Sequence, residues 1–269
     1  MLETEPTITD GKVTTTTDAI CGEVEFRNVS FKYPDAEEYV IQGVSFKANK
    51  GETVAFIGST GCGKSTVINL IPRFYDATEG EVLVNGINVT EYTQHSLRSK
   101  LGYVSQRATL FGGTVRSNVA YGDNGKNGLE SDVIESVYTA QASDFVENME
   151  DGYDGFIAQG GTNLSGGQKQ RLSIARAICR RPEIFIFDDS FSALDYKTDR
   201  KLRDALKREC ADATKLIVAQ RIGTIRDADK IIVLDEGNVV GIGTHDDLMK
   251  NCEIYRQIAY SQLSREELA

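Results

Sequence analysis

One stretch constrains the fold of this chain more than any other, the segment 58–65 with sequence GSTGCGKS. It fits the pattern G-x-x-x-x-G-K-[ST] of a phosphate-binding loop, or P-loop. The β-branched and aromatic run at 53–57 is typical of a buried strand, and a helical pattern begins at 67–70. A strand, a glycine-rich loop and a helix in this order are the context that the motif needs.

Each residue type in the loop has a physical task. The glycines let the backbone turn sharply and point several N–H groups inward, and the helix N-terminus adds partial positive charge. Lys64 supplies a full charge for the β- and γ-phosphates, and the Ser65 hydroxyl can bind Mg²⁺. A glycine-rich turn before an ordinary helix is the alternative, but the flanking elements favour nucleotide binding. The residues expected to hold the phosphates are Ser59, Thr60, Gly61, Cys62, Gly63, Lys64, Ser65 and Thr66.

The length, charge and residue composition of the chain limit the classes of function that it can have. The 269 residues suffice for one large domain or two small ones, and 40% are hydrophobic, which permits a sizeable core. The net charge of −10 argues against nucleic acid as a general partner. The five cysteines lack metal-ligand spacing, and their odd number together with the P-loop indicates reduced thiols in a cytosolic compartment. No apolar run approaches the ~18 residues that span a membrane, so any membrane role requires a partner or a part outside this sequence.

Strand and helix patterns alternate along most of the chain, which implies an α/β fold with a mainly parallel, doubly wound sheet. Strand signals fade between about 123 and 180, where helical spacing predominates, including an amphipathic pattern at 168–179. Asn85-Gly86 predicts a hairpin turn, and Thr244 is expected to cap a helix with Asp247. We expect a flexible leader at 1–21, one domain at 22–262 with its core and β subdomain at 22–122 and 181–262 and a helical insertion at 123–180, and a tail at 263–269.

Three further motifs follow the P-loop in a fixed order. Residues 164–168, LSGGQ, precede a helix, and Asp188 ends a hydrophobic strand, where a carboxylate can hold Mg²⁺ through water. Residues 192–195, SALD, come directly after it. LSGGQ alone could be an ordinary loop-to-helix cap. With Gln106, however, the ordered set resembles the nucleotide-binding domain of an ATP-binding cassette (ABC) transporter over roughly residues 22–260, which implies the ABC ATPase fold with an antiparallel β subdomain, and ATP and Mg²⁺ as cofactors.

The resemblance assigns roles within this chain's own nucleotide site. Tyr33 matches the aromatic residue that stacks on adenine, although it could be a strand-end tyrosine before a proline turn. Gln106 matches the Q-loop glutamine, which senses Mg²⁺ and contacts the transmembrane subunits, although it could be an ordinary polar loop residue. The metal set implied is Ser65, Gln106 and, through water, Asp188.

A second group of residues is implied to act across a dimer interface. Ser165, Gly167 and Gln168 match the signature motif, whose hydroxyl, amides and helix N-terminus bind the γ-phosphate of ATP held by the other domain of a dimer. Asp195 matches the D-loop, which crosses that interface. It could also be a helix N-cap, and the two roles can coexist.

The stretch 106–118 resembles the exporter branch of the family, in which the nucleotide-binding domain follows a fused membrane domain on the cytoplasmic face of a membrane. A separate importer-type ATPase subunit remains an alternative. A soluble ABC protein acting on nucleic acid or ribosomes would predict a second cassette, a coiled-coil insertion or basic patches, none of which is visible. A third alternative is an ATP-gated binding module whose own site never turns over.

Two positions depart from the pattern of active members. Asp189 stands where they place a glutamate that polarises the attacking water, and Gln220 stands where the switch loop, residues 219–221, has a histidine. Aspartate is shorter by about 1 Å, and a displacement of that size can lower a rate about a hundredfold. Glutamine cannot become cationic. A weaker departure is Gln159, where exporters often carry a glutamate.

Together these departures resemble the degenerate half of heterodimeric ABC exporters, in which one site hydrolyses ATP and the other mainly holds it. We therefore expect Asp189, Gln220 and Gln106 to form a catalytic group of weak activity. The expected partner is a second nucleotide-binding domain with an intact catalytic site. Neutral drift in a homodimer is the alternative.

Overall fold

A six-stranded sheet forms the centre of the fold in this computed structural model, which describes residues 7–14, 21–122 and 129–262. Five strands run parallel, and β12 at one edge pairs antiparallel with β11. The strand order is β12 (Asn238–Gly243), β11 (Lys230–Asp235), β3 (Thr53–Gly58), β10 (Thr214–Val218), β9 (Ile184–Asp188) and β6 (Leu101–Val104).

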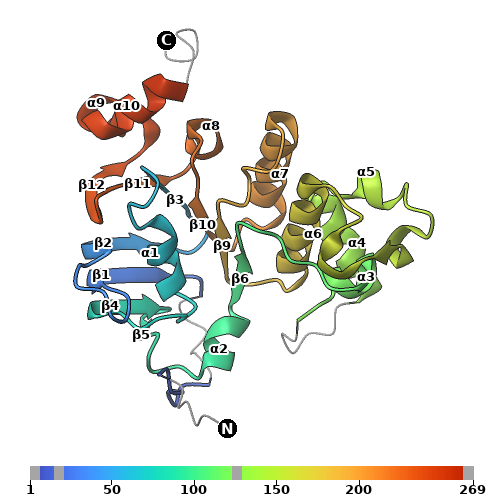
Figure 1. Cartoon of the computed structure of the whole chain (residues 1–269), viewed down its shortest axis with the longest axis horizontal. Helices are drawn as coiled ribbons and strands as arrows, with labels where there is room; N and C mark the ends of the chain where they lie inside the picture. The colour runs from blue at the N-terminus through green and yellow to red at the C-terminus, as the bar shows by residue number, and fades with distance from the viewer. Residues whose placement is uncertain (1–6, 15–20, 123–128, 263–269) are drawn as a thin grey trace.

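A second, antiparallel sheet lies beside the first (Figure 1). Its order is β2 (Ile41–Ala48), β1 (Val24–Phe31), β4 (Glu79–Val84) and β5 (Ile87–Asn88). The predicted hairpin turn joins β4 to β5, and both of its central residues have positive φ, 54° at Asn85 and 76° at Gly86. That pair of values is what a tight type I′ hairpin requires, and Asn-Gly supplies it with little strain.

Alternate residues of the central strands face two separate cores, as period-two strands require. On β9, Phe185 and Phe187 pack into a core shared with the helices, whereas Ile184 and Ile186 face the core shared with the antiparallel sheet. Because both faces are covered, the strand is apolar along its length. The predicted fold class, a mainly parallel α/β core with an antiparallel sheet and helices, is confirmed.

A first group of helices connects or follows the strands of the two sheets. The P-loop helix α1 (Lys64–Leu70) ends before Pro72, because a proline cannot donate the hydrogen bond that would continue the helix. Thr244 caps the helix His245–Asn251 in a capping box with Asp247, as the sequence predicts. The other helices of this part are α2 (Gln94–Ser99), which the sequence did not predict, α7 (Tyr196–Glu209), α8 (Ile222–Ile225), α9 (His245–Asn251) and α10 (Glu253–Gln262).

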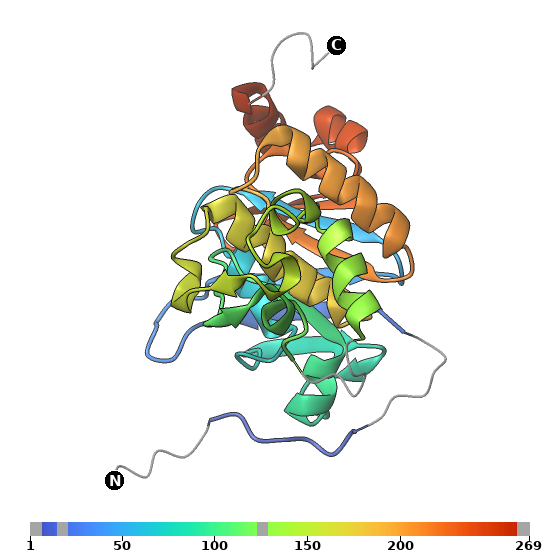
Figure 2. The ribbon, with the colours of Figure 1, turned by 90° about the vertical axis from the view of Figure 1, so that its right-hand side faces the viewer.

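The remaining helices pack together on the side of the molecule away from the antiparallel sheet (Figures 1 and 2). They are α3 (Val115–Val119), α4 (Glu130–Thr139), α5 (Ser143–Val146) and α6 (Gly166–Cys179), with short 3₁₀ turns at Gly152–Asp154 and Gln159–Gly161 and a small sheet of β7 (Gly113–Thr114) and β8 (Phe156–Ile157). No helix within the described parts of the chain combines the length and apolarity needed to cross a membrane.

Some residues of the stretch expected as a leader at 1–21 contact the domain. Val13 forms a parallel bridge with Tyr92, and its backbone N–H donates to Glu91 O at 2.8 Å. Asp10 Oδ1 accepts from Gln94 N at 2.9 Å, and the buried Arg73 donates to Thr9 O at 2.9 Å. The backbone polar groups here find partners on the domain, so residues 9–14 lie against it. Residues 1–6 and 15–20 of the expected leader and the expected tail at 263–269 lie outside the described residues. The expected domain boundaries stay predictions.

Candidate functional site

The P-loop connects the carboxyl end of β3 to α1, with glycines where the backbone requires them. Gly63 is the N-cap of α1 and has φ 98°, and a Cβ there would lie 2.6 Å from Ile41 Cγ2. Gly58 approaches the end of β11 so closely that a Cβ would overlap the Leu234 carbonyl oxygen. A side chain at either position would therefore displace the loop. The sharp turn leaves the first N–H groups of α1 free of intrahelical partners, which suits an anion.

The Lys64 ammonium lies inside the loop. It donates to Gly58 O at 2.9 Å, to Ser59 O at 2.7 Å and to Cys62 Sγ at 3.5 Å. Cys62 itself is buried, whereas Ser59 and Thr60 are exposed. Carbonyl oxygens thus occupy the lysine donors at positions that phosphate oxygens could take over.

Ser65 and Asp188 meet at the edge of the sheet, from α1 and from the carboxyl end of β9. Ser65 Oγ donates to Asp188 Oδ1 at 2.8 Å. Tyr103 donates to Asn69 Oδ1 at 3.0 Å and to Asp188 Oδ2 at 3.4 Å, and burial followed by the Asp188 charge raises the pKa of Tyr103. A hydroxyl and a carboxylate are hard oxygen ligands of the type that Mg²⁺ accepts.

The protein ligands alone are too few for a complete metal site. Within the part of the chain that the structure describes, no group of three or more His, Cys, Asp or Glu side chains could hold a metal ion. Mg²⁺ commonly takes one or two protein ligands together with substrate phosphates and waters. The donor set of Ser65 and Asp188 therefore fits an ion that arrives with a nucleotide.

Asp189 is the most constrained carboxylate of the site. Its Oδ2 accepts two hydrogen bonds, from Gln106 Nε2 at 3.0 Å and from Gln220 Nε2 at 2.7 Å. The residue is 7% exposed and has a left-handed backbone with φ 46°. Burial, reinforced by the neighbouring charge of Asp188, raises the pKa of Asp189, and the two amide donors oppose that rise. The structure thus joins Gln106, Asp189 and Gln220, which the sequence placed 83 and 31 residues apart.

Tyr33 lies next to the helix that follows the P-loop. Its hydroxyl shares a hydrogen bond of 3.2 Å with Thr66 Oγ1. The ring makes edge contacts with Phe31 at 4.9 Å and Tyr75 at 5.2 Å between centroids, and it is half-buried. This arrangement places the Tyr33 ring beside the first turn of α1.

The signature residues form a helix start on a different element. Ser165 caps α6 in a capping box: its Oγ accepts from Gln168 N at 3.3 Å, and Gln168 Oε1 accepts from Ser165 N at 2.9 Å. A Cβ at Gly167 would lie 3.3 Å from Ala193 O, so this helix start is adjacent to the segment 192–195. The exposed Ser165 is a capped helix N-terminus open to solvent, which can bind an anion.

Asp195 caps α7. It accepts from Thr198 N at 3.0 Å and from Thr198 Oγ1 at 2.7 Å, and these bonds hold its pKa below the usual range, the backbone donor first. The N-cap role that the sequence allowed is therefore present, and it leaves the exposed residue available for a further contact.

Sequence reasoning missed Arg221, which joins the switch loop to the segment 192–195. Its guanidinium donates to Ser192 O at 3.0 Å and Leu194 O at 3.2 Å and lies 5.4 Å from the Tyr196 ring centroid. Its only sequence signal was its place directly after Gln220. Gln159, noted as a weak departure, accepts through Oε1 from Gly112 N at 3.1 Å.

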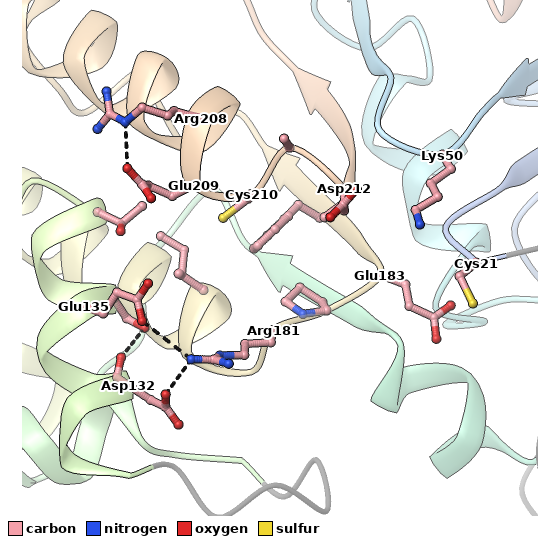
Figure 3. Close-up of a pocket in the computed structure, with 17 residues that line it drawn as sticks. Cys21, Lys50, Asp132, Glu135, Arg181, Glu183, Arg208, Glu209, Cys210 and Asp212 are labelled. Carbon is pink, nitrogen blue, oxygen red and sulfur yellow. Dashed lines mark hydrogen bonds and ion pairs between the residues drawn. The ribbon is translucent and has the colours of Figure 1, made fainter. Parts of the chain in front are cut away.

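A cavity of about 510 Å³ lies elsewhere. Figure 3 shows it between α4, the ends of α6 and α7 and the start of β9, with Arg181 bonded to Asp132 at 2.6 Å and paired with Glu135 at 3.5 Å. The described residues that line it include none of those expected to hold ATP. Those residues gather at the carboxyl ends of the parallel strands, where ligands of open α/β sheets bind.

Comparisons with known proteins all match one family. A model of the ABC transporter family matches residues 41–192, more than half of the chain. An uncharacterized ABC transporter ATP-binding protein of Mycobacterium tuberculosis (strain ATCC 25618 / H37Rv) is 47% identical over 247 residues, covering 91% of this chain and 42% of that protein. The putative multidrug export ATP-binding/permease protein YgaD of Bacillus subtilis (strain 168) is 42% identical over 241 residues, covering 90% and 41%.

A solved structure extends the similarity to three dimensions. The structure of a bacterial Atm1-family ABC exporter with ATP bound matches with a TM-score of 0.90 and 34% identity, over 97% of this chain and 45% of that one. The chain spans less than half the length of each of these three relatives. By its sequence and its fold, this chain belongs to the ABC transporter family and corresponds to the family's nucleotide-binding domain.

Proposed function

We propose that this chain is the ATP-binding domain of a membrane exporter, and that its own site holds Mg·ATP but hydrolyses it slowly. The observation that carries the second part is the hydrogen bonding of Asp189, whose Oδ2 accepts from both Gln106 and Gln220. The first part is supported by the family membership and by relatives named as export proteins.

This chain contains every group that the proposed binding of Mg·ATP requires. Lys64 and the loop N–H groups would hold the phosphates, and Ser65, Asp188 and Gln106 would hold the Mg²⁺ ion. Adenine stacks on Tyr33. A bound Mg²⁺ would supply positive charge that offsets the charge of the phosphates. None of these groups depends on the two departures from the family pattern.

Slow hydrolysis follows from the shape and surroundings of Asp189. A base must accept a proton from an attacking water aligned with the γ-phosphate. The Asp189 carboxylate is shorter by one methylene than the glutamate of active members, and one of its oxygens already accepts two amide donors. Gln220 supplies a neutral amide where a histidine can carry charge. The site therefore keeps its binding groups and loses reach at the catalytic position.

The combination of an intact signature motif with a weakened catalytic position supports pairing with a second, different nucleotide-binding domain. The signature helix of this chain keeps its capped and exposed N-terminus at Ser165, with Gly167 and Gln168 in the first turn. It can therefore bind the γ-phosphate of ATP held by a partner, while Asp195 reaches the same interface. An intact signature beside a weakened base fits a domain that completes the partner's site better than its own.

A second surface suits the membrane domain of such an exporter. A groove of about 350 Å³ is bordered by aromatic side chains, of which Phe74, Phe111 and Tyr121 are 43%, 39% and 54% exposed. It begins at Ser105, next to Gln106, so a partner bound there would touch the Q-loop. We propose that the part of a transmembrane domain exposed at the cytoplasmic face of the membrane occupies this groove.

The test compares binding with turnover. The variants are Asp189→Glu/Gln220→His, which restores the residues of active members, and Asp188→Asn as a control that removes the proposed Mg²⁺ ligand. Because the chain carries both a P-loop and a signature, it can form its own sandwich dimer at high concentration. ATP affinity is measured by titration calorimetry and turnover by phosphate release.

We expect the restored variant to bind ATP within about twofold of the wild type and to turn over at least about tenfold faster. Ser165→Ala in the restored variant should abolish that gain, because the signature acts across the dimer. A wild type that already turns over at the rate expected of the restored variant contradicts slow hydrolysis and indicates a homodimer with two working sites.

A further inference from the structure

The last described turn of α10 contacts the switch loop at two points. Gln262 Nε2 donates to Gln220 O at 2.7 Å, and Gln262 Oε1 accepts from Ile222 N at 2.9 Å. The partners are 42 and 40 residues away in the chain. A single side-chain amide therefore bonds the backbone on both sides of Arg221. None of the roles proposed above accounts for this contact.

Both bonded backbone groups matter to the loop. Ile222 is the first residue of α8, and α8 has no side-chain cap of its own at Arg221. First-turn N–H groups lack intrahelical partners, so Gln262 supplies from a distant helix the acceptor that a local cap would give. Gln220 is the residue whose side chain donates to Asp189. The position of its backbone decides whether that side chain reaches the carboxylate.

Gln262 itself is presented by an anchored helix. Tyr255 and Ala259 of α10 are fully buried in the helix-side core, and the Tyr255 hydroxyl lies 2.7 Å from His245 Nδ1 of α9. Figure 1 shows α10 beside α8. Because α10 is packed at its middle, the amide at its end has a defined direction. Hydrogen bonds then run from Gln262 through the switch loop to Asp189.

We propose that Gln262 is a positioning residue for the nucleotide site: it holds the switch loop so that residue 220 lies against residue 189. This inference rests on the proposed function of that site. It makes α10 an element through which the C-terminal part of the domain determines turnover, without touching nucleotide.

Three variants separate the two bonds from general damage. Gln262→Ala removes both bonds. Gln262→Glu keeps an acceptor for Ile222 N and, at neutral pH, loses the donor to Gln220 O. Gln257→Ala is the matched control, since Gln257 is an exposed glutamine on the same helix whose described bond is a 3.5 Å contact with Glu253.

Amide hydrogen exchange in the 269-residue chain, resolved by NMR, tests the contact. In Gln262→Ala the exchange of the Ile222 N–H should rise about tenfold, because its acceptor is gone. In Gln262→Glu and Gln257→Ala it should stay within about twofold of the wild type. An Ile222 exchange rate that is unchanged in Gln262→Ala overturns the inference, and this readout does not depend on ATP hydrolysis.

Turnover tests the positioning role. It is measured in the wild type and in the Asp189→Glu/Gln220→His background, where the Gln262 bonds to backbone atoms remain possible. Gln262→Ala should lower kcat about fivefold or more, with KM for ATP and Tm unchanged, and Gln257→Ala should leave kcat unchanged. Faster Ile222 exchange with unchanged kcat overturns the positioning role. If the Asp189→Glu/Gln220→His background turns over no faster than the wild type, the proposed cause of slow hydrolysis is refuted. The exchange rate of the Ile222 N–H still tests the Gln262 contact in that case.

Discussion

Ser65 donates a hydrogen bond of 2.8 Å from its hydroxyl to Asp188 Oδ1. The two residues come from the start of α1 and the end of β9, 123 positions apart in the chain. Parallel strands whose carboxyl ends meet at one edge bring them together. The side chains proposed to hold Mg²⁺ are therefore already adjacent.

We expect Asp188→Asn and Ser65→Ala to weaken ATP binding in the presence of Mg²⁺ about tenfold or more, because each removes an oxygen ligand or its charge. Binding in EDTA should change much less, since the metal is then absent. Titration calorimetry with and without Mg²⁺ measures both. The matched control is Ser59→Ala, which keeps the Ser59 carbonyl bonded to Lys64. Equal losses with and without Mg²⁺ would contradict a metal role.

Tyr33→Ala should weaken ATP binding about tenfold, because stacking a base on an aromatic ring is worth about 1–3 kcal/mol. Tyr33→Phe should bind nearly as the wild type does, since the ring remains and only the bond to Thr66 is lost. Tyr39→Ala is the control: Tyr39 follows in the same connection, and its hydroxyl donates to Glu79 at 2.7 Å. Competition between ATP and inorganic triphosphate distinguishes a base contact from a phosphate contact, because only ATP affinity should fall.

Gly11→Ala should release residues 9–14 from the domain, because an added Cβ would overlap the Glu91 carbonyl oxygen. Hydrogen exchange at Val13 N, which donates to Glu91 O at 2.8 Å, should rise about tenfold. Lys12→Ala is the control, since this exposed residue contributes its backbone N–H to the same carbonyl. Unchanged protection of Val13 in the glycine variant would show that the segment accommodates the side chain.

His245 should make stability depend on pH. Burial is the main cause that lowers the pKa of this histidine, and the charge of Arg226 adds to it. The unfolded chain therefore binds the proton more readily, so the contribution of the neutral ring is present above about pH 6.5 and is lost as the pH falls below that value. Each unit of pKa depression corresponds to about 1.4 kcal/mol.

Urea denaturation at pH 7.5 and 5.5 measures this effect. His245→Asn should lower stability at pH 7.5, because it disrupts the bond to Tyr255, and should reduce the difference between the two pH values. His95→Asn is the control for the second histidine of the chain. A wild-type difference that survives unchanged in His245→Asn would assign the pH dependence to carboxylates.

Local signals were sufficient for most of the fold. The apolar run at 53–57 is β3, the run ending at Asp188 is β9, and Asn85-Gly86 turns the β4–β5 hairpin. These predictions succeed because strand periodicity and turn chemistry act over a few residues. The order of motifs along the chain also identified the family, which the family match confirms.

Contacts between distant segments were not predictable in the same way. Nothing local in residues 9–14 indicates that their backbone pairs with 91–94, and nothing in the last turn of α10 indicates that Gln262 bonds residue 220. The helix α2 escaped detection because it is only six residues long. The roles of the predicted site residues, and the boundaries of the expected domains, stay predictions that the experiments above address.

The backbone at Asp189 is held by atoms that do not belong to its side chain. Its N–H donates to Val218 O at 3.0 Å, and its carbonyl accepts from Ser192 Oγ at 2.8 Å. Neither of these bonds involves the side chain that a substitution at this position would change. Aspartate and glutamate codons differ in their third base alone, and so do those of glutamine and histidine. One third-base substitution at residue 189 and one at residue 220 therefore separate this domain from the residues of active members. The proposed loss of catalysis needs no more than these two base changes.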